Sequence, residues 1–331
     1  MTAGLVLGKF APLHLGHQSL IEGALEQVDT LYVLVYDAPS VTRIPLAKRA
    51  TWIRELHPSA TVIEGRGAPE ASGRDPQIMR AQERYIMSVV PSPITHFFSG
   101  EWYGDHVSRA LGAHDIRVDE ARRRFPVSGT MLRSDPKRYR QFVHPRVYQD
   151  LVRRVVLLGA ESTGKTSLAA RLASAFDTVW VPEFGRDYWL AHRGPDGRLS
   201  STQLGDLAEG HRQREDALGR EANRLLIVDT DARTTRQYAR WYHGGTVEPH
   251  LQWRADTARE RADLTVLCGD DFAYVEDGTR AGEPRRIEAQ GEIRLELKAG
   301  SGTWIEVRGP IQERVELVRS AITRFEILPW Y

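Results

Sequence analysis

The chain has 331 residues, with 45 lysine and arginine residues against 44 aspartate and glutamate residues and a formal net charge of +1. Its length allows two domains of ordinary size, and its balanced charge creates no overall field that would favour nucleic acid or a membrane surface. A single cysteine, Cys268, excludes an internal disulfide framework. No apolar run approaches the length of about 18 residues that a membrane span requires, and no signal-peptide pattern is present, so we expect a cytoplasmic protein.

The N-terminal half begins with a short apolar run, residues 4–7, predicted to be a buried strand. It leads into Gly8-Lys9-Phe10-Ala11-Pro12-Leu13-His14-Leu15-Gly16-His17. Apolar residues at helical spacing predict a helix over 18–28. His14 and His17 would then lie near its N-terminus, where ring N–H groups can donate to a phosphoryl oxygen, and Gly16 permits close backbone approach. Taken alone, the pattern also fits two polar turn residues that cap a helix.

Strands are further predicted over 31–35, 61–63 and 95–98, alternating with helices. This alternation is typical of parallel βαβ units, in which ligands bind at the carboxyl ends of the strands. Three aromatic residues are candidates to stack on a heteroaromatic ring, although large aromatic side chains more often fill a core. They are Trp52, Trp102 and Tyr103.

A second anion site is predicted near the end of this half, in residues 125–133. Ser128 and Thr130 offer hydroxyls and free N–H groups at a helix start, and Arg133 follows one turn later. A short helical connector is expected over 136–152.

The C-terminal half begins with an apolar run, residues 155–158, that ends at Gly159-Ala160-Glu161-Ser162-Thr163-Gly164-Lys165-Thr166. This is the P-loop pattern in the strand–loop–helix context that it requires. The glycines let backbone N–H groups converge on phosphate oxygens, Lys165 can reach the β- and γ-phosphates, and Thr166 offers a hydroxyl to Mg²⁺. A chance match at a strand–helix turn is the alternative.

Three later segments carry polar groups at predicted strand ends. Glu183 and Arg186 follow a strand at 178–181 and could position a hydroxyl nucleophile, or could simply form an ion pair at a helix start. A strand at 225–228 ends at Asp229, the Walker-B arrangement in which a carboxylate holds Mg²⁺. The loop around Arg280, with Arg285 and Arg286, is either a lid over phosphates or a solvated loop. Residues 281–302 match no pattern. A last strand is predicted over 305–307, and a last helix over 311–325.

The two N-terminal motifs, G-x-F-x-P-x-H-x-G-H and S-x-T-x-x-R, resemble those of the HxGH nucleotidyltransferase superfamily. Joined to G-A-E-S-T-G-K-T, E-F-G-R-D-Y, D-T-D-A-R-T-T and D-G-T-R, they resemble the NadR-type bifunctional family over nearly the whole chain. That family combines nicotinamide-nucleotide adenylyltransferase with ribosylnicotinamide kinase. The resemblance implies two α/β domains: a Rossmann-like HxGH nucleotidyltransferase sheet in 1–135 and a P-loop kinase sheet in 153–331.

The resemblance also implies a role for each motif. In the first domain, His14 and His17 would stabilise charge at the α-phosphate of ATP, and Ser128, Thr130 and Arg133 would hold the pyrophosphate. ATP would also meet Gly8, Lys9, Phe10 and Gly16. In the second domain, Lys165 and the loop residues Gly159, Glu161, Ser162, Thr163 and Gly164, with Arg280, would bind ATP. Thr166 and Asp229 would hold Mg²⁺, Glu183 would orient or deprotonate the riboside hydroxyl, and Trp52, Trp102, Tyr103, Arg186 and Asp231 would meet substrate.

The expected partners are ATP, nicotinamide riboside, nicotinamide mononucleotide and NAD. Some family members carry an N-terminal helix-turn-helix; because the first motif begins at Gly8, we expect no specific nucleic-acid partner and no membrane. A homo-oligomer is left open. Three alternatives remain at this point. The first domain could be a nucleotide sensor beside a working kinase, or an adenylyltransferase for another phosphate. An ATP-switched interaction protein would leave the HxGH motif unexplained.

Overall fold

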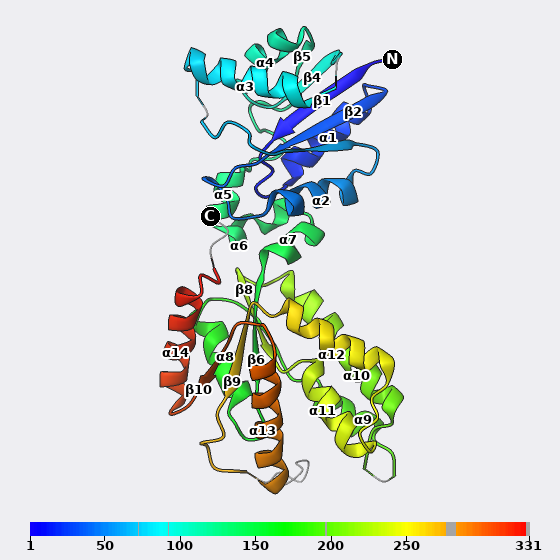
Figure 1. The fold of residues 1–331 in the computed structure, drawn as a ribbon, viewed down its shortest axis with the longest axis vertical. Helices are drawn as coiled ribbons and strands as arrows, with labels where there is room; N and C mark the ends of the chain where they lie inside the picture. Colours follow the sequence, from blue (N-terminus) through cyan, green and yellow to red (C-terminus); the bar gives the residue numbers. More distant parts are fainter. Residues whose placement is uncertain (72, 92, 196, 276–282, 329–331) are drawn as a thin grey trace. The chain divides into compact units, whose positions relative to one another are not determined.

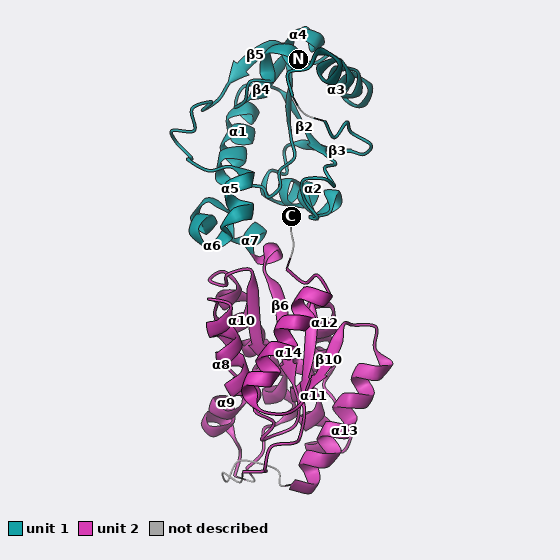
Figure 2. Cartoon of the chain, turned by 90° about the vertical axis from the view of Figure 1, so that its left-hand side faces the viewer, with its two compact units in different colours: residues 1–148, 329–331 teal, residues 149–328 magenta. Residues whose placement is uncertain are grey.

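The computed structural model describes residues 1–331 except 72, 92, 196, 276–282 and 329–331. Two compact units divide the described chain, unit 1 (residues 1–148) and unit 2 (residues 149–328) (Figure 2). Each is built around one five-stranded sheet whose strand pairs are all parallel. The predicted fold class, two α/β domains with parallel sheets, is confirmed. The division falls within the stretch 136–152, for which a connector is predicted.

Unit 1 has the strand order β3-β2-β1-β4-β5, with β1 at the centre (Figure 1). Its strands are β1 (Ala3–Gly8), β2 (Thr30–Tyr36), β3 (Thr61–Gly65), β4 (His96–Ser99) and β5 (His114–Arg117). Its helices are α1 (Leu15–Leu25), α2 (Leu46–Leu56), α3 (Pro76–Val89), α4 (Gly104–Leu111), α5 (Gly129–Ser134), α6 (Pro136–Tyr139), the 3₁₀ helix η1 (Arg140–Phe142) and α7 (Pro145–Leu151), in which the division between units falls.

The core of unit 1 follows from the alternation of side chains along β1. Leu5 and Leu7 pack in one cluster with Ile86 of α3 and Val107 of α4. Val6, which points to the opposite face of the sheet, is equally buried. Burial of both faces explains why the strand is a continuous apolar run rather than an alternating one.

Unit 2 has the strand order β10-β9-β6-β8-β7. Its strands are β6 (Arg153–Leu158), β7 (Trp180–Val181), β8 (Leu225–Asp229), β9 (Leu264–Cys268) and β10 (Trp304–Val307). Its helices are α8 (Lys165–Ala175), α9 (Gly185–His192), α10 (Ser201–Gly219), α11 (Ala232–Tyr242), α12 (Pro249–Arg261), α13 (Glu283–Ala299) and α14 (Ile311–Arg324). Every residue of β8 and β9 is buried, and α8 and α14 pack on these strands in one core cluster.

Several elements were not predicted from the sequence. Among them are the helix α4, the short edge strand β5, the helices α11 and α12, and the helix α13, which occupies most of the unassigned stretch 281–302. The expectation of a polar loop is therefore wrong for Arg285 and Arg286, because both residues lie in the first turn of α13. No helix in the described part of the chain is long and apolar enough to cross a membrane.

Candidate active sites

The loop after β1 carries the two motif histidines. It lies where the strand order reverses, between β1 and β4, the position at which open α/β sheets bind ligands. His14 caps α1, since its Nδ1 accepts the backbone N–H of His17 at 3.4 Å, and His17 Nδ1 accepts the backbone N–H of His14 at 3.4 Å. The two rings stack with their centroids 3.6 Å apart. Because both Nδ1 atoms are acceptors, each neutral ring carries its proton on Nε2.

Both histidines are neutral at neutral pH. Burial lowers the pKa of His14 to about 4, and the charge of Arg122 acts in the same direction. Burial, together with His14 and Arg122, holds the pKa of the His17 imidazole well below its usual range, although a hydrogen bond to the Pro12 backbone acts in the opposite direction. At neutral pH the two rings can therefore act as N–H donors but not as cations.

Helix α5 brings the second motif to the same loop. Ser128 caps this helix through its Oγ, which accepts the backbone N–H of Met131 at 3.2 Å. Arg133 donates to the Ala11 carbonyl at 2.7 Å and to Thr130 Oγ1 at 3.2 Å. A Cβ at Gly129 would lie 3.0 Å from the Ala11 carbonyl oxygen, so only glycine allows α5 this approach without a shift. Two motifs more than a hundred residues apart thus form one polar site.

The other residues of the first motif shape the loop around the histidines. A Cβ at Gly16 would lie 3.2 Å from the His14 ring, and one at Gly8 would lie 3.3 Å from the Phe10 ring. Phe10 is buried and meets His17 edge-on, with centroids 4.9 Å apart, so it supports a histidine instead of offering its own ring. Burial lowers the pKa of Lys9, and Arg133 lowers it further.

One of the three aromatic candidates is wrong. Trp52 is 0 % exposed on α2 and has no surface for a ligand, because the inward face of that helix fills the core. Trp102 and Tyr103 are half-buried just before α4. Tyr103 donates its hydroxyl to the Leu7 carbonyl at 3.3 Å, and Arg74 lies over the Trp102 ring. A substrate role for these two residues stays a prediction.

Arg49 is a residue of unit 1 that the sequence analysis missed. It is 1 % exposed and donates to the carbonyls of Lys9 at 2.6 Å, Tyr36 at 2.7 Å and Ile44 at 3.0 Å. It therefore ties the histidine loop to the end of β2. A buried arginine on an amphipathic helix carries no motif by which it could be recognised.

In unit 2 the loop after β6 has the shape of a P-loop. Gly159 and Gly164 have φ of 147° and 78°, values that only glycine adopts readily. Lys165 Nζ donates to the carbonyls of Gly159 at 2.9 Å and Ala160 at 2.8 Å. Thr163 is fully buried and donates to the Ala160 carbonyl at 2.8 Å, so its side chain shapes the loop. Ser162 Oγ accepts the backbone N–H of Val275 at 3.2 Å.

Thr166 and Asp229 meet at the start of α8. Thr166 Oγ1 donates to Asp229 Oδ2 at 2.6 Å, whereas Asp229 Oδ1 is buried without a hydrogen-bond partner among the described residues. Burial raises the pKa of Asp229 to about 6, with Lys165 and Thr166 opposing the shift. A hydroxyl and a carboxylate with an unused oxygen are ligands that suit Mg²⁺. The pair therefore fits the metal expected there.

A cavity of about 560 Å³ adjoins the P-loop. Glu183, Arg186 and Asp231 line it together with Lys165 and Thr166, so the structure brings these predicted residues to one place. The carboxylate of Asp231 forms an ion pair with Arg233, which donates to both of its oxygens at 2.7–3.1 Å. Arg280 lies outside the described residues.

The cavity also has an aromatic wall that the sequence analysis missed, formed by Trp189 of α9 and Tyr238, Trp241 and Tyr242 of α11. Tyr238 and Tyr242 are parallel, with centroids 6.0 Å apart, and Tyr238 donates its hydroxyl to Glu161 at 3.0 Å. A signal was present in the sequence, since the three residues of α11 recur at helical spacing soon after Asp229.

Comparison with known proteins gives a match for each unit. Residues 5–135 match the cytidylyltransferase-like family, and residues 154–314 match an AAA domain family. Two solved structures share the fold: a NadR protein in complex with NR (21 % identity, TM-score 0.58) and a NadR protein in complex with NAD and AMP-PNP (20 %, 0.56). Each aligns over 98 % of this chain and 96 % of its own.

Two curated relatives are similar over most of the sequence. The trifunctional NAD biosynthesis/regulator protein NadR of Escherichia coli (strain K12) is 30 % identical over 298 residues, which cover 85 % of this chain and 72 % of that protein. The NadR protein of Salmonella typhimurium (strain LT2) is 29 % identical over 296 residues, with 84 % and 71 % covered. The chain therefore belongs to the NadR family of NAD biosynthesis/regulator proteins.

Proposed function

We propose that the chain is a bifunctional enzyme of NAD synthesis. Unit 2 transfers the γ-phosphoryl group of ATP to the ribose 5′-hydroxyl of nicotinamide riboside, and unit 1 transfers AMP from ATP to the resulting mononucleotide, releasing pyrophosphate. The observation that carries the proposal is that each unit has its own polar loop, with residue types suited to phosphate, at the switch point of its own sheet. The relatives named above, with their ligands NR, NAD and AMP-PNP, are consistent with these substrates.

Phosphoryl transfer in unit 2 would rest on positioning and charge, because the reaction needs no protein nucleophile. The P-loop N–H groups and Lys165 hold the phosphates, after Lys165 has exchanged its carbonyl partners for phosphate oxygens. Thr166 and Asp229 would hold Mg²⁺, which neutralises charge on the phosphates when it is bound. Glu183 lines the same cavity and is the group we assign to orient or deprotonate the riboside hydroxyl.

The aromatic wall gives the riboside its recognition. Nicotinamide riboside carries a positive pyridinium ring, and a cation is attracted to the face of tryptophan and tyrosine. Trp189, Trp241 and Tyr242 line the cavity that Glu183 also lines. We therefore assign the pyridinium ring to this wall and the ribose to the region of Glu183 and Arg186.

Adenylyl transfer in unit 1 would use neutral donors and one fixed cation. His14 and His17 donate from Nε2 to the α-phosphate, where charge develops in the transition state. The Ala11 carbonyl and Thr130 hold Arg133 in place. Arg133 and the start of α5 then balance the negative charge of the leaving pyrophosphate. No covalent intermediate with the protein is needed.

Incubation with nicotinamide riboside, Mg²⁺ and ATP tests the proposal directly. Chromatography should resolve ADP and mononucleotide from the first reaction, and dinucleotide and pyrophosphate from the second. With mononucleotide in place of riboside, dinucleotide should form without ADP. Failure to form mononucleotide would reject the kinase assignment, and failure to form dinucleotide from mononucleotide would reject the adenylyltransferase assignment.

A further inference from the structure

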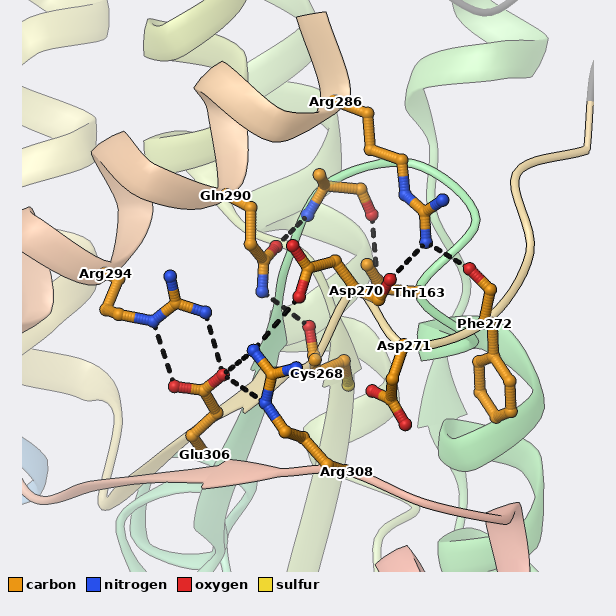
Figure 3. Close-up of polar contacts among 12 residues, drawn as sticks. Thr163, Cys268, Asp270, Asp271, Phe272, Arg286, Gln290, Arg294, Glu306 and Arg308 are labelled. Carbon is orange, nitrogen blue, oxygen red and sulfur yellow. Dashed lines mark hydrogen bonds and ion pairs between the residues drawn. The ribbon is translucent and has the colours of Figure 1, made fainter. Parts of the chain in front are cut away.

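A glutamine of α13 connects two backbone groups beneath the P-loop. Gln290 is 1 % exposed. Its Oε1 accepts the backbone N–H of Ala160 at 2.9 Å, and its Nε2 donates to the carbonyl of Cys268, the last residue of β9, at 2.9 Å. Figure 3 shows its amide between the loop and the Cys268 carbonyl. Because all four atoms are buried, neither backbone group has water as a substitute partner.

The peptide group that joins Gly159 to Ala160 carries a contact at each end. Gln290 binds its N–H, that of Ala160, and its carbonyl, that of Gly159, accepts Lys165 Nζ at 2.9 Å. Rotation of this peptide group would turn the carbonyl away from Lys165. Gln290 therefore fixes the backbone of the first turn of the P-loop, whose carbonyls hold Lys165 until it moves to the phosphates.

The glycine of the same turn explains why a clamp is useful here. A Cβ at Gly159 would lie 2.8 Å from the Cys268 carbonyl oxygen, so the loop and β9 are in close contact. A glycine with a φ of 147° restrains its own backbone weakly. Gln290 supplies the missing restraint by bonding to both sides of this contact.

Two arginines hold the next part of the loop from outside. Arg286, one turn before Gln290 on α13, donates to the carbonyls of Phe272 at 2.6 Å and Asp270 at 3.0 Å (Figure 3), and at 3.4 Å to that of Ser162. Arg314 of α14 is fully buried and donates to the Thr163 carbonyl at 2.8 Å. These contacts are made to carbonyls, so Gln290 alone among the three holds an N–H group of the loop.

We propose that Gln290 is a positioning residue for phosphoryl transfer, and that it acts on ATP through the peptide group that joins Gly159 to Ala160 and through Lys165. The inference rests on the proposed kinase function of unit 2 for its substrate. It adds that α13, outside every recognised motif, determines the geometry of the ATP site. Loss of the clamp should weaken nucleotide binding and slow transfer, because the same loop meets the phosphates in both states.

Three full-length variants test the proposal. Gln290→Met keeps the volume but loses both hydrogen bonds. Gln290→Glu can form both bonds only when its carboxyl is protonated, since an ionised carboxylate cannot donate to the Cys268 carbonyl. Arg294→Met is the matched control on the same helix; it removes the ion pair with Glu306 at 2.8 Å without touching the P-loop (Figure 3).

Two measurements are made on each variant: the dissociation constant for a non-hydrolysable ATP analogue, and kcat/KM for phosphorylation of nicotinamide riboside. In Gln290→Met, the affinity for the analogue and kcat/KM should each fall at least tenfold, while KM for riboside changes less than twofold. In Gln290→Glu, the affinity for the analogue and kcat/KM, each taken relative to wild type at the same pH, should rise as the pH falls from 8 to 6. Arg294→Met should stay within twofold of wild type.

Analogue binding by Gln290→Met within twofold of wild type would overturn the proposal. Equal losses in Gln290→Met and Arg294→Met would also overturn it, because α13 would then act only as a structural support. Failure of the proposed kinase function has a different signature. Wild type would then bind the analogue, with the same dependence on Gln290, but would form no mononucleotide from riboside.

Discussion

The hydroxyl of Thr166 lies 2.6 Å from Oδ2 of Asp229, whose other oxygen is buried without a partner in the described structure. An ionised carboxylate in such a place costs folding free energy, and the raised pKa of Asp229, about 6, records that cost. The site keeps the carboxylate in spite of the cost. A cation that binds there would supply the missing interaction.

Asp229→Asn should therefore separate stability from activity. Between the usual pKa of 3.8 and the folded value of about 6 the folded state binds more protons, so the wild-type carboxylate lowers stability as the pH rises through that window. Above it, the neutral amide should stabilise unit 2 by about 1–3 kcal/mol in the absence of nucleotide and metal. Riboside phosphorylation should fall by at least a hundredfold. Thermal unfolding with a chelator, together with the kinase assay, checks both; a variant less stable than wild type contradicts the argument.

Lys165→Ala should remove one activity and leave the other. The ammonium group donates to two carbonyls of the P-loop, which lies in unit 2. Phosphorylation of riboside should fall by several orders of magnitude, because the charge that follows the γ-phosphate is lost. Dinucleotide formation from supplied mononucleotide should persist within twofold. Loss of both activities in a folded variant would refute the assignment of one site to each unit.

The sequence predicted those parts of the site that follow from local chemistry. The P-loop, the aspartate at the end of β8 and the two histidines of the first motif are each encoded within a few residues. The structure adds the juxtaposition of the histidine loop with α5, through Arg133 and the Ala11 carbonyl. The roles of these residues are proposals, which substitutions at Asp229, Lys165 and His17 test.

What escaped prediction depends on packing between distant segments. Trp52 and Trp241 are both tryptophans on helices, but the orientation of the helix places Trp52 in a core and Trp241 in a cavity wall. Helix α13 lacks the usual pattern of apolar residues inside and polar residues outside, because its apolar Ile287 is 64 % exposed while its polar Gln290 is buried. Its buried polar groups have partners far away in the sequence, and no local rule reveals such partners.

His17→Ala tests whether unit 1 is catalytic. A sensor needs only contacts that hold the ground-state nucleotide, whereas a catalyst needs donors that act where charge develops. Loss of one such donor typically costs on the order of 3 kcal/mol, or roughly a hundredfold in rate. We expect kcat and kcat/KM for dinucleotide formation to fall together, with KM for ATP little changed. A rise in KM for ATP at constant kcat would instead support a binding role, and riboside phosphorylation serves as the internal control.

The last prediction concerns the stability of unit 1 in acid. Burial lowers the pKa of His14 from the ordinary value of 6.5 to about 4, so between these values the unfolded chain binds more protons than the folded one. Stability is complete above pH 6.5 and is lost as the pH falls toward 4. At pH 5 the loss from His14 alone should be about 2 kcal/mol, and the lowered pKa of His17 adds to it in the same direction.

Hydrogen exchange of the β1 amides, corrected for the intrinsic rate at each pH, measures this stability in the full-length chain. His14→Asn removes the titrating ring but retains an acceptor for the His17 N–H, because the Oδ1 of asparagine matches the position of the Nδ1 atom. Its protection should therefore depend less steeply on pH between 7 and 5. His114→Asn, at an exposed position on β5, is the control and should retain the wild-type slope. Equal slopes in wild type and His14→Asn would show that the His14 ring is not buried in its neutral form. The electrostatic basis for its role as a neutral donor would then be lost.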